Sequence, residues 1–158
     1  MRNIFRAIIA LITLSCCTPK NGVESQARVK SIKNMISKDK EIPSISYREF
    51  LDKIYDFEND SAQKWTNKSG RPIVIDFYAT WCAPCKKLTP SLEALAKEYP
   101  NVDFYKVDTQ EEERLAIAFN IQSVPTLMFI PKEGEPYLSL GYISKGEIKQ
   151  IIKELVKY

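Results

Sequence analysis

The sequence predicts an α/β domain in which a central mixed β-sheet is flanked by helices on both faces. Three observations support this fold class. The apolar run PIVIDFY at 72–78 is typical of a strand buried on both faces. Apolar residues recur at helical spacing in several other segments. Strand and helix patterns also alternate along the chain, which favours a sheet covered by helices.

The elements follow one another from about Ile42, where the composition changes. Apolar residues at helical spacing predict a helix over 47–57 with Ser46 as its N-cap, and a polar loop over 61–70 follows. After the buried strand, the pattern predicts a helix over 84–99, a strand over 102–107, a helix over 111–119, strands over 126–130 and 136–140, and an amphipathic helix capped by Ser144. Pro90 should bend its helix, because proline lacks the amide proton and clashes with the preceding turn. The expected order is β-α-β-α-β-α-β-β-α, which places one strand before the first helix.

Bulk composition excludes several classes of function. A chain of 158 residues suits one compact domain with a short appendage, and a net charge of +3 is too small to indicate a nucleic-acid partner. The absence of histidine removes Ser-His-Asp and Cys-His catalysis and most zinc and haem sites, so we expect no metal and no cofactor. No apolar run reaches the roughly 18 residues of a transmembrane helix.

Residues 1–17, MRNIFRAIIALITLSCC, resemble a bacterial lipoprotein signal. A positive region precedes an apolar stretch of signal-peptide length, and two adjacent cysteines follow. The resemblance implies lipidation at Cys16 or Cys17; Ser15 slightly favours Cys16, but the sequence does not separate them. A cleaved signal without lipid and a short uncleaved anchor are the alternatives. All of these interpretations place the domain outside the cytoplasm.

Residues 18–41 are polar, lysine-rich and poor in aromatics, which favours a mobile tether. Val29, Ile32 and Ile36 recur at helical spacing, so one short helix is an alternative there. The folded domain is then expected to span 42–158.

Cys82 and Cys85 form a C-x-x-C pair between the buried strand and the next helix. A helix N-terminus stabilises a thiolate, which is the nucleophile in disulfide exchange. We therefore expect the first cysteine to be exposed and to attack, and the second to resolve the mixed disulfide. A zinc half-site lacks further ligands, and a haem attachment would need histidine where Lys86 stands. A structural disulfide is the main alternative, but so short a loop gives little entropic stabilisation, which favours redox chemistry.

From about Ser46 to the C-terminus, the chain resembles the thioredoxin family. The sequence W-C-A-P-C is similar to the family's W-C-G-P-C. The family's other motifs occur in the correct order: a buried acid, a nearby lysine, a proline in the active-site helix, a cis-proline loop and a glycine beside the site. The residues that match them are Asp76, Lys106, Pro90, Val124-Pro125-Thr126 and Gly141. Three features depart from the pattern, namely Tyr78, Tyr142 and the dipeptide Ala83-Pro84, and they leave the reduction potential and substrate range open.

The resemblance implies a mechanism and a substrate surface. Cys82 would attack a substrate disulfide, and Cys85 would resolve the mixed disulfide. Asp76 would accept the Cys85 proton, because burial raises the pKa of a carboxyl group, while Lys106 would oppose that rise. The residues that the resemblance assigns to substrate binding are Trp81, Ala83, Pro84, Val124, Pro125 and Gly141.

We therefore expect a thiol-disulfide oxidoreductase of the cell envelope or periplasm. It would act mainly as a reductase of disulfide-bearing proteins, as a monomer, and would be recharged by a membrane electron donor. Oxidase or isomerase activity is one alternative; the superfamily's periplasmic oxidases usually carry histidine in the motif and a large helical insertion, and neither is present. The other alternative is a binding or chaperone module, which the presence of both cysteines disfavours.

Overall fold

The computed structural model describes residues 41–59 and 64–157. These residues form eight elements in chain order: α2 (Tyr47–Lys53), β1 (Ile73–Tyr78), α3 (Ala83–Glu98), β2 (Asp103–Asp108), α4 (Glu113–Ala118), β3 (Thr126–Ile130), β4 (Tyr137–Leu140) and α5 (Lys145–Leu155). The strands form one sheet in the order β2-β1-β3-β4. Strand β1 pairs in parallel with β2 and antiparallel with β3, and β4 pairs antiparallel with β3. The predicted mixed sheet is confirmed.

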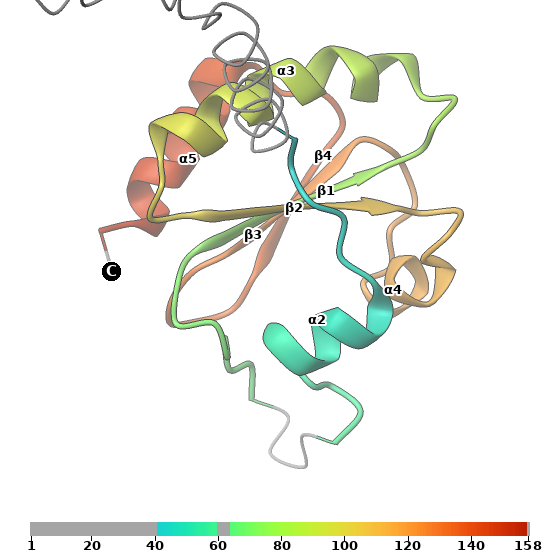
Figure 1. Cartoon of the computed structure of the whole chain (residues 1–158), viewed down its shortest axis with the longest axis vertical. Helices are drawn as coiled ribbons and strands as arrows, with labels where there is room; N and C mark the ends of the chain where they lie inside the picture. Colours follow the sequence, from blue (N-terminus) through green and yellow to red (C-terminus); the bar gives the residue numbers. More distant parts are fainter. Residues whose placement is uncertain (1–40, 60–63, 158) are drawn as a thin grey trace, which may run out of the picture. The chain divides into compact units, whose positions relative to one another are not determined.

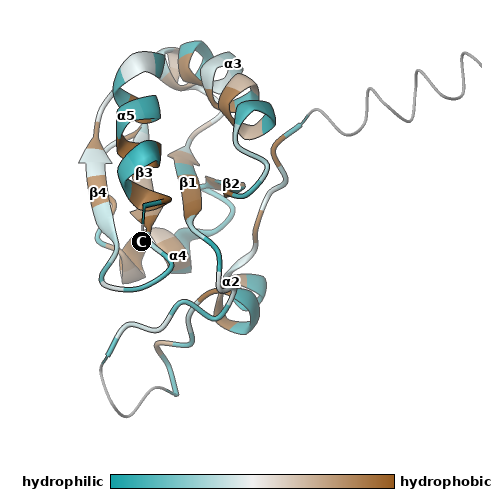
Figure 2. Ribbon diagram, turned by 90° about the vertical axis from the view of Figure 1, so that its left-hand side faces the viewer, coloured by the Kyte–Doolittle hydropathy of each residue, from teal (hydrophilic) through white to brown (hydrophobic). Residues whose placement is uncertain are grey.

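Helices cover both faces of the sheet, as predicted: α3 and α5 lie on one side, and α2 and α4 on the other (Figure 1). Alternate residues of a strand point to opposite faces. Val74 of β1 accordingly joins the core beneath α3 and α5, whereas Ile73 and Ile75 join the core on the other side. Strand β1 is hydrophobic along most of its length, while α5 alternates between polar and apolar residues (Figure 2). The central strand is therefore buried on both faces.

The expected first strand is reduced to one bridge, between Ser44 and Lys106. The Lys106 N–H donates to Pro43 O at 3.0 Å, and the Ile45 N–H donates to Lys106 O at 3.1 Å. The prediction of a full strand was wrong because the next residue, Ser46, already caps α2. Only a single β-bridge forms before the helix begins.

Two helices are shorter than predicted. Helix α2 ends at Lys53, because the Tyr55 N–H bonds Phe50 O at 3.1 Å and closes the helix with a wide turn. Helix α4 begins at Glu113, because Asp108 holds the preceding turn: its carboxylate accepts from the Gln110 N–H at 2.9 Å. The Ser144 cap of α5 is confirmed. Pro90 lies inside α3, and the bend it should cause stays a prediction.

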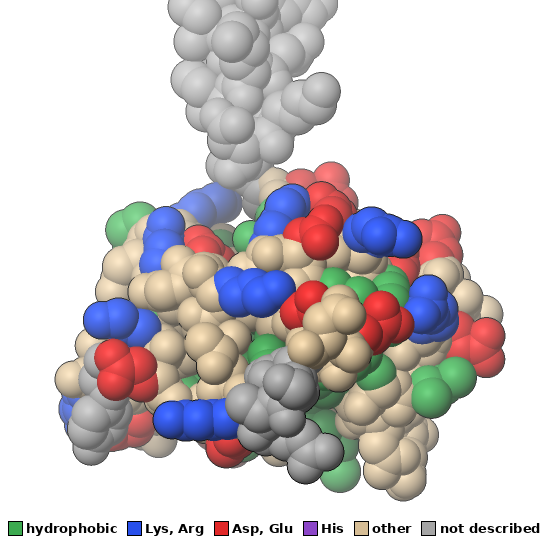
Figure 3. Space-filling view, turned by 90° about the horizontal axis from the view of Figure 1, so that it is seen from below, with side chains coloured by type: hydrophobic (Ala, Val, Ile, Leu, Met, Phe, Trp, Pro, Cys, Tyr) green, Lys and Arg blue, Asp and Glu red, His purple; other side chains and the backbone are tan. Residues whose placement is uncertain are grey.

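Charged side chains of both signs are interspersed on the face of the molecule shown in Figure 3. Exposed ion pairs near α2 and α4 include Lys53 with Glu49 at 2.7 Å and Arg114 with Glu58 at 3.0 Å. Such exposed pairs contribute little to stability, because water screens them. The two apolar cores are therefore the main source of stability.

The expected export segment, the lipidation at Cys16 or Cys17 and the short helix around Ile32 lie outside the described residues, so they stay predictions. Within 41–59 and 64–157, no helix is both long enough and apolar enough to cross a bilayer.

Candidate active site

Cys82 and Cys85 form a disulfide at the N-terminus of α3, with the two Sγ atoms 2.02 Å apart. The chain leaves β1 and turns, as the Cys82 N–H bonds Ala79 O at 3.1 Å, and Cys82 then serves as the N-cap of α3. Pro84 fits the first helical turn, where no amide proton is needed. The Cys85 N–H donates to Cys82 Sγ at 3.1 Å. The outer sulfur therefore lies where the helix dipole and a free amide favour negative charge.

The expected exposure of Cys82 is wrong for this disulfide state, in which only 2% of the residue is exposed. Its sulfur is bonded to Cys85 and packs in a small cluster with Ala79, beside Tyr78 and Val124. The neighbours in the motif form the outer surface instead. Trp81 is 69% exposed, and Ala83 and Pro84 are exposed as well. These three residues therefore form the exposed surface of the motif.

The peptide bond between Val124 and Pro125 is cis, as the family resemblance predicted. Val124 packs against the cysteine cluster, so the structure brings this loop and the disulfide together. Pro125 O accepts a hydrogen bond from the Gly141 N–H at 2.8 Å, which fixes the end of β4 beside the loop. Gly141 has a φ of 78°, a left-handed conformation that glycine adopts without strain.

Two exposed apolar side chains flank Gly141. Leu140 is 66% exposed and Tyr142 is 52% exposed. The sequence had indicated Tyr142 only as a departure from the family pattern, and Leu140 only as part of a strand. Leu140 is the last residue of the edge strand β4, and Tyr142 lies just beyond it. Together they extend the apolar rim of the site beyond the predicted residues.

Asp76 is buried in the middle of β1, on the face covered by α3, with 4% of the residue exposed. Its Oδ1 has no hydrogen-bond partner among the described groups. Burial raises the pKa of this carboxyl from 3.8 to about 7, and the charge of Lys106 acts in the opposite direction. Lys106 lies directly opposite Asp76 in the parallel pair of β1 and β2. Both effects follow the directions predicted from the sequence.

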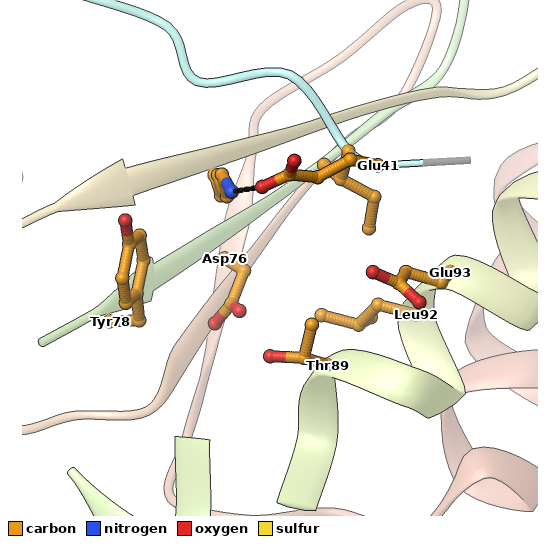
Figure 4. A pocket seen from close by; sticks show the side chains of 8 residues that line it. Glu41, Asp76, Tyr78, Thr89, Leu92 and Glu93 are labelled. Atoms are coloured by element: carbon orange, nitrogen blue, oxygen red, sulfur yellow. Dashed lines mark hydrogen bonds and ion pairs between the residues drawn. The ribbon is translucent and has the colours of Figure 1, made fainter. Parts of the chain in front are cut away.

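A cavity of about 80 Å³ adjoins Asp76, which points into it from the sheet while Thr89 and Glu93 face it from α3 (Figure 4). A wider hollow beside Cys85 shares two wall residues with this cavity, Tyr78 and Thr89. The Thr89 hydroxyl donates to Cys85 O at 3.1 Å. The cavity beside Asp76 and the hollow beside Cys85 are therefore neighbours that share part of their walls.

The ammonium group of Lys106 pairs with the carboxylate of Glu41 (Figure 4). Glu41 belongs to the polar segment 18–41, which the sequence predicts as a tether, and it was not among the predicted site residues. No signal could have found it, since its partner is 65 residues away along the chain. In the part of the chain that the structure describes, no cluster of acidic or cysteine side chains could hold a metal ion.

The disulfide joins the N-cap residue Cys82 to Cys85 in the first turn of α3, and the cis-proline loop packs against it. This arrangement, with a buried acid on the preceding strand, is typical of thiol-disulfide oxidoreductases. The comparisons with known proteins agree. The family model named Thioredoxin matches residues 53–154, and the chain belongs to the thioredoxin family. It is therefore a protein-disulfide reductase of the thioredoxin type.

Individual relatives support the same assignment. The chain is 44% identical over 112 residues to a thioredoxin of Borreliella burgdorferi, an alignment that covers 70% of this chain and 94% of the other. Among solved structures, a chloroplastic thioredoxin z has a TM-score of 0.62 and 26% identity, with 75% of this chain and 96% of that chain covered. The oxidised mitochondrial thioredoxin 3 of Saccharomyces cerevisiae has a TM-score of 0.51 and 35% identity, with 55% and 81% covered.

Proposed function

We propose that this protein reduces disulfide bonds of other proteins outside the cytoplasm, as a monomer held on a membrane by a lipid at Cys16 or Cys17. One observation carries the chemical part of the proposal. The Cys85 N–H points at Cys82 Sγ from the first turn of α3, at 3.1 Å. The same amide would stabilise the Cys82 thiolate in the reduced protein, and the thiolate is the form that attacks disulfides.

The reaction transfers two electrons to the substrate in two exchanges. The Cys82 thiolate attacks one sulfur of the substrate disulfide, and the other substrate sulfur leaves as a thiolate and takes up a proton. Cys85 then gives its proton to Asp76, and its thiolate attacks Cys82 Sγ. The bond between Cys82 Sγ and the second substrate sulfur breaks, and that sulfur leaves as a thiolate and takes up a proton. The products are a substrate dithiol and the Cys82–Cys85 disulfide, the state seen in this structure.

Asp76 suits the role of proton acceptor because its pKa lies at about 7, raised by burial and lowered by the charge of Lys106. A base with a pKa near the working pH can both take up and release a proton efficiently. The cavity beside Asp76 exceeds the volume one water needs, and its walls carry polar groups. The proton would pass directly from Cys85 or through water held there.

Substrate would dock on the exposed surface over the disulfide. Trp81 supplies a flat apolar rim, with Ala83 and Pro84 beside it. The backbone of Val124 would pair with an extended substrate segment, next to Pro125 and Gly141.

The variant Cys82→Ser tests the chemistry. We expect the purified full chain to lose insulin-disulfide reduction by a factor of at least about 10³, because serine forms no mixed disulfide. Cys17→Ser makes the same chemical change outside the site and should keep the wild-type rate. Turnover that survives in Cys82→Ser would contradict the proposal. Slow wild-type turnover with tight partner binding would favour the binding module instead.

The direction of electron flow is tested by the midpoint potential of the Cys82–Cys85 couple. The lack of histidine between the two cysteines supports a reductant. We expect a value of about −270 mV, whereas a value of about −120 mV would indicate an oxidase.

The location is supported by the signal-like residues 1–17. Export would separate the protein from cytoplasmic recycling, so a membrane electron donor would have to reduce the Cys82–Cys85 disulfide. We expect the bacterial product to appear in the membrane fraction with a lipid label. The double change Cys16→Ala and Cys17→Ala should release it, and a wild-type protein found in the cytoplasm would contradict this part.

A further inference from the structure

The segment before α2 lies along β2 at Lys106. Two backbone hydrogen bonds join Lys106 to this segment. The Lys106 N–H donates to Pro43 O at 3.0 Å, and Lys106 O accepts from the Ile45 N–H at 3.1 Å. Ile42 is 6% exposed and belongs to the core beneath α3 and α5. These contacts fix Glu41, the residue before Ile42, next to the Lys106 side chain.

Lys106 lies between two carboxylates. It is the register partner of Asp76 on the adjacent strand, so both side chains point to the face covered by α3. Its ammonium nevertheless donates to Glu41 Oε1 at the outer side of the cavity (Figure 4). Glu41 is well exposed, with 73% of its side chain accessible, whereas Asp76 is buried. The cation therefore pairs with the outer acid, and Oδ1 of the inner acid has no partner among the described groups.

We propose that Glu41 is a positioning residue for the proton-transfer step: it holds the Lys106 ammonium at the mouth of the cavity and away from Asp76. The inference rests on the proposed role of Asp76 as the acceptor of the Cys85 proton. Asp76 then keeps a carboxyl group that exchanges its proton near neutral pH, rather than one locked in an ion pair.

The charges around Asp76 give the expected sign. The titratable groups that line the cavity with Asp76 are Lys106 from β2, Glu41 from the preceding segment, Tyr78 from β1 and Glu93 from α3. The inner cysteine lines the adjoining hollow. If Glu41 loses its charge, Asp76 and Glu93 are the acids that remain with the ammonium in the lining of this cavity. A closer cation stabilises the ionised form of Asp76 and lowers its pKa. A base with a lower pKa accepts the thiol proton less readily.

Glu41→Gln in the full chain tests this inference. The measurement is the rate at which Cys85 resolves a preformed mixed disulfide, followed from pH 5 to pH 9. We expect the midpoint of the profile to move to lower pH by about half a unit, with a rate at high pH lower by about twofold. Glu98→Gln, which removes the partner of Lys149 on another surface, is the matched control and should leave the profile unchanged.

A second variant shows whether the effect runs through Lys106. In a Lys106→Gln background, Glu41→Gln should no longer move the midpoint, since no ammonium is left to position. A shift of equal size in that background would overturn the inference, as would an unchanged midpoint in Glu41→Gln alone. Asp76→Asn tests the proposed role of Asp76 on which the role of Glu41 rests. If the pH profile of this variant equals that of the wild type, Asp76 is not the proton acceptor, and Glu41 has no proton transfer to support.

Discussion

The two faces of the sheet are packed in different ways. The side of α2 and α4 is filled by aromatic rings that contact one another, with Phe50 and Phe119 5.0 Å apart and Phe57 and Phe119 5.7 Å apart between centroids. The side of α3 and α5 is mainly aliphatic, and it also holds Asp76 and the cavity of about 80 Å³. Strand β1 contributes to both, since Ile75 points to the aromatic side and Asp76 to the other.

The two faces of one sheet can thus serve stability and chemistry separately. A buried carboxyl with an unpartnered oxygen disfavours the folded state when it is ionised, because it loses its hydration. The closely packed aromatic side supplies apolar burial on the opposite face of the same strand. Substitutions on the aromatic face should therefore change mainly the free energy of unfolding, whereas substitutions at Asp76 should change mainly the dependence on pH.

The largest expected effect follows from truncating the aromatic core. Phe50 is fully buried and its ring contacts Phe57 and Phe119. Phe50→Ala should lower the free energy of unfolding by about 3–5 kcal/mol, measured by urea denaturation of the disulfide form. If this variant does not fold, Phe50→Leu should show a smaller loss of about 1–1.5 kcal/mol. The reduction rate per folded molecule should stay at the wild-type value; a specific rate that falls tenfold would break the separation between the two faces.

Removing the buried charge from the other face should stabilise the protein, and only at higher pH. The pKa of Asp76 is raised in the folded state from 3.8 to about 7, so the folded protein binds the proton more tightly than the unfolded chain does. This group therefore costs no stability below about pH 4, and the cost grows as the pH rises towards 7 and is then constant. The difference between the two pKa values corresponds to roughly 4 kcal/mol as an upper limit.

Asp76→Asn should accordingly be more stable than the wild type at pH 8, relative to the same comparison at pH 4, by about 2–4 kcal/mol. Urea denaturation of the disulfide form at both pH values measures it. An equal difference at pH 4 and pH 8 would mean that Asp76 titrates normally in the folded protein. The face covered by α3 and α5 would then carry no electrostatic cost from Asp76.

The smallest expected effect concerns two helix caps, one on each face. Ser46 and Ser144 each accept from a backbone N–H three residues on, that of Glu49 or of Glu147, at 3.3 Å. The Glu49 and Glu147 carboxylates in turn accept from the backbone N–H of Ser46 and Ser144, which completes both capping boxes. Ser46→Ala and Ser144→Ala should each cost about 1 kcal/mol, measured by thermal or urea unfolding, with the pH profile of reduction unchanged. A profile moved by either change would link the caps to the chemistry.

Local sequence patterns predicted the elements that depend on near neighbours. The continuous apolar run at 72–78 indicated a strand buried on both faces because both faces of β1 are covered. The predicted limits of β3 match the structure, and the helix after Cys82 differs by one residue at each end. Helix α2 was predicted too long, because the apolar spacing continues through Tyr55 and Phe57, which pack as loop residues against other aromatic rings.

Patterns of residues a few positions apart predicted the two cysteines at a strand-to-helix junction and the acid on the central strand, because helix starts and strand burial are encoded locally. The cis bond before Pro125 was predicted only by the resemblance to the thioredoxin family. Three features depend on tertiary contacts: Cys82 is covered in the disulfide state, Oδ1 of Asp76 has no partner among the described groups, and Lys106 turns to Glu41. Exposure and electrostatic environment depend on which distant segments the fold brings together, and no local pattern records that.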